Sequence, residues 1–312
     1  MQQPHATTSS THNRPTTPNP KDFTLVLITT PEVASPGSRQ FDAEVRAARA
    51  LFADGGLTRL HLRKPHSPPE HVAAYLSALP PEHRGRVVVH GAAVAGCALA
   101  AAVAPFVRAG ELGGVHYREL DRAESARKGH AFWDDGAQQG RALLRSSGYH
   151  SLAAAVGGAV VAEAVAAAAA AGADEAAAAA AAEEEAATAD REPWPPGAYL
   201  DYCFLSPVYD SISKAGYRAA GFLAPGEGRR RRLAAALGRS PVPVLALGGV
   251  GPGKLAELRD AGFAGAAVLG AVWRAGGGGD VVAAYRGLAE EAREAAGRRG
   301  GAAAKGGGGG RS

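Results

Sequence analysis

The chain contains little cysteine and no long run of bulky apolar residues. Of its 312 residues only Cys97 and Cys203 are cysteines, and they lie far apart, each within an apolar segment. We therefore expect two buried, reduced thiols and no disulfide framework. A membrane span would need about 18 consecutive apolar residues. The alanine tract after Ser151 comes nearest, but alanine is too weakly hydrophobic, so we expect no membrane partner.

Aromatic residues are also scarce, at 6% of the chain, and none interleave its basic runs. Four arginines stand at 229–232, and the segment after Ala296 is rich in glycine, arginine and lysine, within a formal net charge of only +4. Basic runs can bind nucleic acid, but without neighbouring aromatic side chains they are more often solvated helix ends or termini. We expect no nucleic-acid partner.

What the chain does contain is a regular alternation of apolar and helical patterns. The strand-like runs are 25–29, 57–63, 86–90, 114–117, 143–147, 199–205, 242–247 and 266–269. Helical patterning is clearest at 41–54, 69–79, 92–104 and 252–261. Strands and helices in alternation predict parallel βαβ units and an α/β fold.

Eight such strands favour a (β/α)8 TIM barrel, whose chemistry lies on loops at the carboxyl ends of the strands. The fourth unit, 118–141, shows no clean helix. The alternative is an open, doubly wound sheet, which is less favoured because no G-x-G-x-x-G turn follows the first strand.

Low-complexity segments divide the chain. Residues 1–21 are rich in Thr, Ser, Pro and Asn and have no acidic residue, which predicts a disordered N-terminal segment. One barrel domain is expected over 22–299, with an alanine-rich low-complexity insertion, partly helical, at 152–196. Residues 300–312 are expected to be a disordered glycine-rich tail. We expect a cytoplasmic protein; the N-terminal composition leaves a plastid location open.

Two loops look suited to anions. The strand at 199–205 is followed by Ser211, Ser213 and Lys214, and hydroxyl donors with an ammonium are what a phosphate needs. The strand at 242–247 is followed by Gly248 and Gly249, where bare backbone can approach an anion. Both loops follow strands, which predicts an enzyme that handles phosphorylated small molecules.

Cationic and imidazole side chains stand at other strand ends. His61 and Arg63 share a face of the second strand, with Lys64 at the rim, and the planar arginine fork suits bidentate phosphate binding. Further histidines near successive strand ends are His90, His116 and His150. Four histidines would suit zinc. There is no H-x-H pair, however, so we expect hydrogen-bonding or acid–base roles for them instead.

Five segments together resemble one family. They are His61-Leu62-Arg63-Lys64-Pro65, Gly148-Tyr149-His150-Ser151, Leu205 to Lys214, Leu247-Gly248-Gly249-Val250 and Ala266-Ala267-Val268-Leu269-Gly270. In this order and spacing they resemble the thiamine phosphate synthase / TenI (thiazole tautomerase) family. The resemblance covers Leu25 to Trp273 apart from the alanine insertion, and it implies a (β/α)8 barrel.

The synthase members of that family join hydroxymethylpyrimidine diphosphate to thiazole phosphate and release diphosphate. The resemblance therefore implies phosphorylated pyrimidine and thiazole substrates and Mg2+ as cofactor, and it leaves a homo-oligomer open. By position, it implies catalytic roles for Arg63, Lys64, His150 and Lys214. It implies substrate-binding roles for His61, His90, Ser211, Ser213, Gly248, Gly249, Gly270 and Ala271.

The chain departs from the family pattern at several positions. Pro65 replaces a lysine, for which we expect Lys64 to substitute. An Asn-Asp pair is here His90-Gly91, so one aspartate that would bind Mg2+ is absent, and Asp121 is left as the expected metal ligand.

We expect a synthase-type transferase. The alternatives are a TenI-like thiazole tautomerase, with His150 as the acid–base residue, and a non-catalytic barrel that binds thiazole or thiamine phosphates. An unrelated phosphosugar isomerase would need a carboxylate at a strand end, and none is obvious.

Overall fold

A computed structural model describes residues 17–18, 22–32, 34–92, 97–127, 143–157, 160–163, 200–212, 216, 218–274 and 280–297. Most of the segment 1–21, most of the insertion 152–196 and all of 300–312 lie outside the described residues, so the expectations about their order stay predictions. Ser213 and Lys214 also lie outside them.

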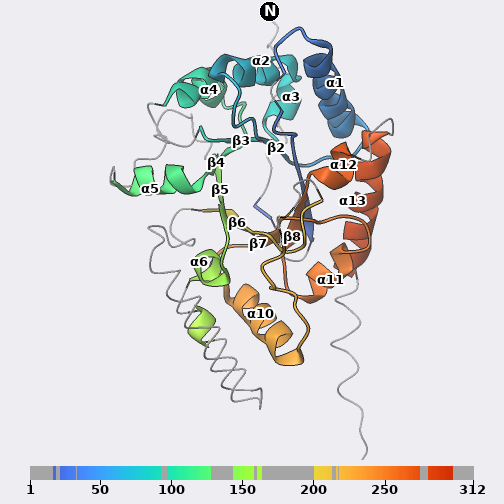
Figure 1. The fold of residues 1–312 in the computed structure, drawn as a ribbon. Coiled ribbons are helices and arrows are strands. Elements are labelled where there is room, and N and C mark those ends of the chain that lie inside the picture. The colour runs from blue at the N-terminus through green and yellow to red at the C-terminus, as the bar shows by residue number, and fades with distance from the viewer. Residues whose placement is uncertain are drawn as a thin grey trace, which may run out of the picture.

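Eight parallel strands close into a barrel in sequence order (Figure 1). They are β1 (Thr24–Ile28), β2 (Leu60–Leu62), β3 (Val87–His90), β4 (Gly114–Tyr117), β5 (Leu144–Tyr149), β6 (Tyr202–Leu205), β7 (Val244–Ala246) and β8 (Gly265–Val268). Strand β1 pairs with both β2 and β8, which closes the sheet. The predicted α/β (β/α)8 TIM barrel is confirmed, and the open sheet is excluded.

Helices surround the strands (Figure 1). They are α1 (Arg39–Ala53), α2 (Pro69–Ala78), α3 (Pro81–Arg84), α4 (Ala98–Arg108), α5 (Glu119–Arg127), α6 (Leu152–Val156), α10 (Glu227–Arg239), α11 (Leu255–Asp260), α12 (Gly270–Trp273) and α13 (Val281–Gly297). Helix α6 opens the alanine-rich insertion, and Ser151 caps it by accepting from the backbone N–H of Ala154.

The fourth unit, in which the sequence showed no clean helix, contains helix α5. The helix lacks an apolar stripe, and its fully buried side chain is Arg122. That guanidinium donates to Ser147 Oγ at 2.6 Å and to the Gly148 carbonyl at 2.9 Å, and it lies over the ring of Tyr149. Polar contacts to β5 therefore hold this helix, and apolar periodicity does not reveal it.

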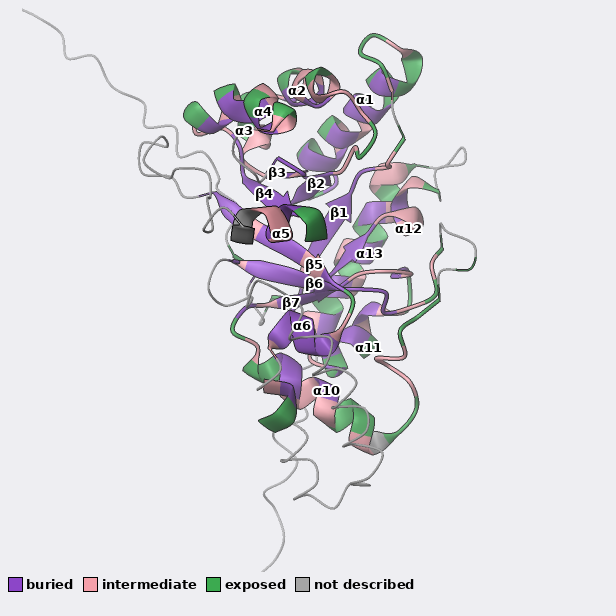
Figure 2. Ribbon diagram, turned by 60° about the vertical axis from the view of Figure 1, so that its left-hand side comes forward, coloured by how far each residue is buried: buried purple, intermediate pink, exposed green. Residues whose placement is uncertain are grey.

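The strands are largely buried (Figure 2), and their alternate residues belong to two separate hydrophobic clusters. The inner cluster fills the barrel and includes Val26, Ile28, Tyr202, Phe204 and Leu245. The outer cluster packs the other strand faces against the helices. Because side chains alternate along a strand, one set of residues supports the helices while the other fills the barrel beneath its carboxyl-end rim.

The two cysteines are free thiols, as expected, but Cys97 is only partly buried, whereas both were expected to be buried. Cys203 is buried, and burial raises the pKa of its thiol to about 12. Within the described ranges, no helix combines the length and the apolar character that crossing a membrane would require.

Candidate active site

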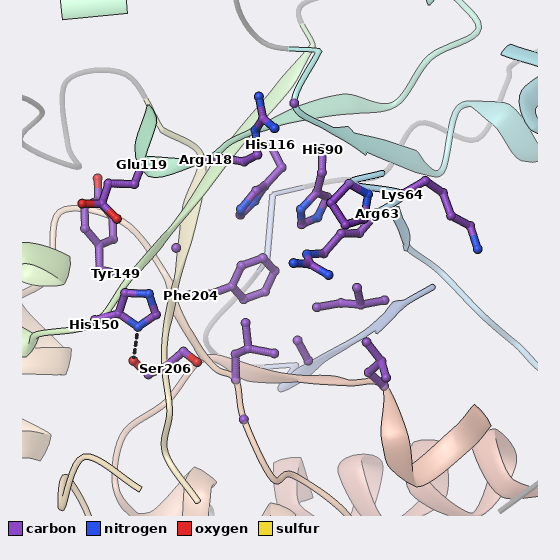
Figure 3. A pocket seen from close by; sticks show the side chains of 18 of the residues that line it. Arg63, Lys64, His90, His116, Arg118, Glu119, Tyr149, His150, Phe204 and Ser206 are labelled. Carbon is purple, nitrogen blue, oxygen red and sulfur yellow. Dashed lines mark hydrogen bonds between the residues drawn. The ribbon is translucent and has the colours of Figure 1, made fainter. Parts of the chain in front are cut away.

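One cavity of about 690 Å³ opens at the carboxyl ends of the strands (Figure 3). Residues distant in sequence meet there. Those anticipated from the sequence that line the cavity are Arg63, Lys64, His90, His150, Ser211, Gly248, Gly249 and Gly270. The structure thus gathers Ser211 of one predicted anion loop, the glycines of the other and the end of β2 around a single space.

Arg63 presents to this cavity a charge that has no partner within the described part of the chain. Its backbone is held by Thr29, whose hydroxyl accepts from the Arg63 N–H at 2.9 Å and donates to the Arg63 carbonyl at 3.2 Å. The half-buried guanidinium points inward (Figure 3) and donates to no acceptor among the described residues. Burial and the nearby charge of Arg118 lower the pKa of Arg63. An unpaired guanidinium beside a second one is suited to an anion.

Arg118, which follows β4, is the second cation at the cavity. Asp121 accepts from the Arg118 backbone N–H at 2.8 Å, from Nε at 3.0 Å and from Nη2 at 2.8 Å. These bonds fix the guanidinium at the cavity wall and raise the pKa of Arg118. Arg118 was not among the site residues predicted from the sequence. The pattern that could have indicated it is an arginine directly after a strand, three residues before an aspartate.

The described residues do not fit the Mg2+ that the resemblance implies. Asp121 is buried, and both its carboxylate oxygens already accept from Arg118. At Gly91, where φ is +81°, an added Cβ would lie 3.0 Å from Cζ of Arg118, so the guanidinium fills the space next to that position. Among the described residues that line the cavity, Glu119 is the one carboxylate. We assign no step to Mg2+.

Lys64 does not direct its ammonium into the cavity. Its Nζ lies 2.6 Å from Glu44 Oε2 and 3.1 Å from the Glu32 carbonyl, and the side chain extends away from the centre (Figure 3). Burial raises the pKa of Glu44, and the Lys64 charge opposes this rise. The expectation that Lys64 substitutes for the missing lysine is therefore corrected: its charge neutralises a buried carboxylate of α1.

Three of the four strand-end histidines, His61, His90 and His116, meet beneath the cavity; we call them the histidine cluster. His61 Nδ1 lies 2.9 Å from His90 Nε2, and the His90 and His116 rings stack with centroids 3.9 Å apart. His90 and His116 line the cavity. His61 is fully buried and does not line the cavity. It can therefore act on a bound molecule only through His90.

His150 lies in the wall between the loops after β5 and β6 (Figure 3). Its Nδ1 is 2.9 Å from the carbonyl of Ser206. A carbonyl only accepts, so Nδ1 carries the proton, and in the neutral ring Nε2 keeps its lone pair. The exposed imidazole is therefore prepared to accept a proton at Nε2.

The glycines after β7 allow two loops to touch. Gly249 has φ of +63°, and an added Cβ would lie 2.1 Å from the carbonyl oxygen of Asp210. The β6 loop carrying Ser211 therefore lies directly against the β7 loop. Gly270 lines the same side of the cavity, whereas Ala271 stands behind it, beside Gly251.

These features define a (β/α)8 barrel with a cationic cavity at its rim. No protein-family model matches the chain, and no curated protein sequence matches it.

Among solved structures, the chain is similar to a thiamine phosphate pyrophosphorylase from Bacteroides thetaiotaomicron. The two share 20% identity with a TM-score of 0.50, over 86% of this chain and 97% of that one. A thiamine phosphate pyrophosphorylase from Pyrococcus furiosus gives 18% identity and a TM-score of 0.51, over 88% and 98%. At these identities the likeness shows the fold.

Proposed function

We propose that this protein is a transferase of the thiamine phosphate synthase type. The observation that carries the proposal is the Arg63 guanidinium, which has no partner among the described residues and shares one cavity with the glycine loop after β7. Such a cavity suits two phosphorylated reactants, a pyrimidine diphosphate and a thiazole phosphate. The barrel shared with two thiamine phosphate pyrophosphorylases supports the same assignment.

The proposed reaction is a substitution at the pyrimidine methylene carbon. The carbon–oxygen bond breaks, and its electron pair leaves with the diphosphate. The lone pair of the thiazole nitrogen then forms the new carbon–nitrogen bond, which yields a thiazolium product without proton transfer. Arg63 and Arg118 stabilise the charge that develops on the leaving diphosphate, while the Gly248–Gly249 loop holds the thiazole phosphate.

The test is an assay with hydroxymethylpyrimidine diphosphate and thiazole phosphate. We expect thiamine phosphate and diphosphate to form in equal amounts, with or without added Mg2+. Binding of both compounds without either product would contradict the proposal and favour a non-catalytic barrel.

Lys214 provides a further prediction. By position it matches the lysine after the family's hydroxyl pair, and in the sequence it follows Ser211, which lines the cavity. We expect Lys214→Ala to remove most of the turnover, because the resemblance implies a catalytic role for this cation, while the circular dichroism spectrum stays unchanged. Unchanged turnover in this variant would count against the synthase assignment.

A second candidate, a thiazole tautomerase, is favoured by His150. Its fixed Nδ1–H leaves Nε2 as a base at the cavity. If the protein is a tautomerase, we expect His150→Gln to lower metal-free tautomerisation of the thiazole carboxylate phosphate by about 10²–10⁴-fold, the usual contribution of a general base. If it is a synthase, diphosphate release should fall far less in this variant than in Arg63→Ala.

A further inference from the structure

The histidine cluster is assembled by three consecutive strands. His90 on β3 and His116 on β4 are direct partners across the sheet. His61 on β2 pairs with Val88, two residues before His90 on the same face of β3. All three imidazoles therefore project toward the barrel interior just below the cavity. One ring nitrogen from each lies within 4.8 Å of those from the other two.

Two of the three rings have a polar partner on their other nitrogen. His61 Nε2 lies 2.7 Å from Tyr202 Oη, and His116 Nδ1 lies 3.0 Å from Ser146 Oγ. Such contacts are typical of histidines that bind metals, because they fix the ring and its tautomer. When these nitrogens donate, His61 Nδ1 and His116 Nε2 keep their lone pairs.

The surroundings of the three imidazoles disfavour a positive charge on them. Burial lowers the pKa of His61 and of His90 well below the ordinary value and lowers that of His116 to about 3. Nearby arginines contribute to the same shift. Neutral imidazoles have a lone pair available for an ion without first losing a proton.

We propose that the histidine cluster binds a divalent transition-metal ion of the Zn2+ type. Imidazole ligands suit Zn2+, Co2+, Ni2+ and Cu2+, whereas Mg2+ requires oxygen ligands that the cluster lacks. Because His90 and His116 line the cavity, the ion has three protein ligands and an open position toward that space. This is the arrangement of catalytic rather than structural zinc sites.

Binding requires a small rearrangement. Zn–N bonds of about 2.0–2.1 Å place tetrahedral ligand nitrogens roughly 3.3–3.4 Å apart. The His61–His90 pair at 2.9 Å must separate by a few tenths of an ångström, while the widest pair, within 4.8 Å, must close. The hydrogen bond between these rings is lost. His90 moves its own proton to Nδ1, so that Nε2 can bind the ion and no net proton is released.

The charges of Arg63 and Arg118 reach the cluster, since both lower the pKa of His90 and of His116. The same positive charges repel a metal cation and oppose its binding at the histidine cluster. Arg63→Met should therefore bind the ion more tightly than the unaltered protein. A purely structural role for the histidines would predict no such increase.

The experiment is equilibrium dialysis of metal-free protein against Zn2+ or Co2+, without substrate. We expect one ion per chain and a visible Co2+ absorption spectrum of nitrogen ligation. In His90→Ala and His116→Ala, affinity should fall by more than the roughly 10–100-fold that loss of an outer partner costs. His66→Gln, which alters an exposed histidine near His61, is the matched control and should bind normally.

Tyr202→Phe keeps the ring and its packing while removing the hydroxyl, so it tests the site if the alanine variants fail to fold. We expect a 10–100-fold weaker affinity for it. The proposal is overturned if the unaltered protein retains no ion. It is also overturned if His90→Ala retains the ion equally, or if Mg2+ displaces it. None of these results depends on turnover, so the transferase proposal stands or falls separately.

Discussion

Arg63→Ala is expected to lower the turnover of thiamine phosphate formation by about 10²–10³-fold, the usual cost of removing one preorganised group that stabilises developing charge. The side chain is half-buried, faces the cavity and has no acceptor among the described residues, so its charge is available to a substrate. Its backbone, held by Thr29, stays in place in the variant. The loss should therefore be catalytic, with little change in stability.

The measurement is kcat/KM for diphosphate release, with a thermal unfolding curve for each variant. Arg63→Lys should recover part of the activity, because it restores the charge without the planar fork. The control is Arg108→Ala at the exposed end of α4, which should behave like the unaltered protein. Equal activity of Arg63→Ala and Arg108→Ala would remove the basis for the proposed diphosphate site.

Lys64→Ala is expected to destabilise the fold by about 3–5 kcal/mol, the typical cost of leaving a buried charge without its partner. The Lys64 and Glu44 side chains are only 6% and 8% exposed, and their charged atoms are 2.6 Å apart. Removing the ammonium leaves the Glu44 carboxylate desolvated and without its cation. The change in the free energy of unfolding can be measured with urea.

The stability that Lys64→Ala loses should depend on pH. The pKa of Glu44 is already raised in the folded state, and removal of Lys64 raises it further. Above pH 4.5, the ordinary pKa of the unfolded carboxyl, the folded variant holds a proton that the unfolded chain releases. The free energy of unfolding of the variant should therefore fall as pH rises. Its difference from that of the unaltered protein should be larger at pH 8 than at pH 5.

The double variant Glu44→Gln/Lys64→Met provides the control, because it removes both charges. We expect it to be more stable than Lys64→Ala and to lose most of the additional pH dependence. A Lys64→Ala protein with unaltered stability at pH 8 would mean that the ion pair does not neutralise a buried charge.

The fold was predictable because it depends on local patterns. The strands are short apolar runs bounded by turn residues, and their number and alternation with helices indicate a barrel. Helix α5 was missed because its attachment to β5 depends on Arg122 and on acceptors some 25 residues away. Local periodicity carries no information about such a contact.

The candidate site was predicted in part. Arg63, His90, His150, Ser211 and the β7 glycines could be recognised because residues at strand ends converge in any closed barrel. The partners of charged groups could not be recognised in this way. The pairing of Lys64 with Glu44 depends on how α1 packs behind β2, and that of Arg118 with Asp121 depends on the first turn of α5.

The histidine cluster shows how register changes an interpretation. His61, His90 and His116 are separated by 29 and 26 residues, without the short spacings of most zinc motifs. In the barrel, the three histidines lie on the consecutive strands β2, β3 and β4. The pairing of His90 with His116 brings two of the rings together. The sequence placed these histidines near successive strand ends, but the contacts between their rings follow only from the register of the closed barrel.

The Arg63 guanidinium has a consequence for the ions that the proposed reaction would need. A positive group that is part of the polypeptide is present once in every molecule, whatever the surrounding supply of free magnesium. If this group takes over the charge neutralisation that a free ion would give to a diphosphate, product formation should remain steady when the magnesium concentration changes.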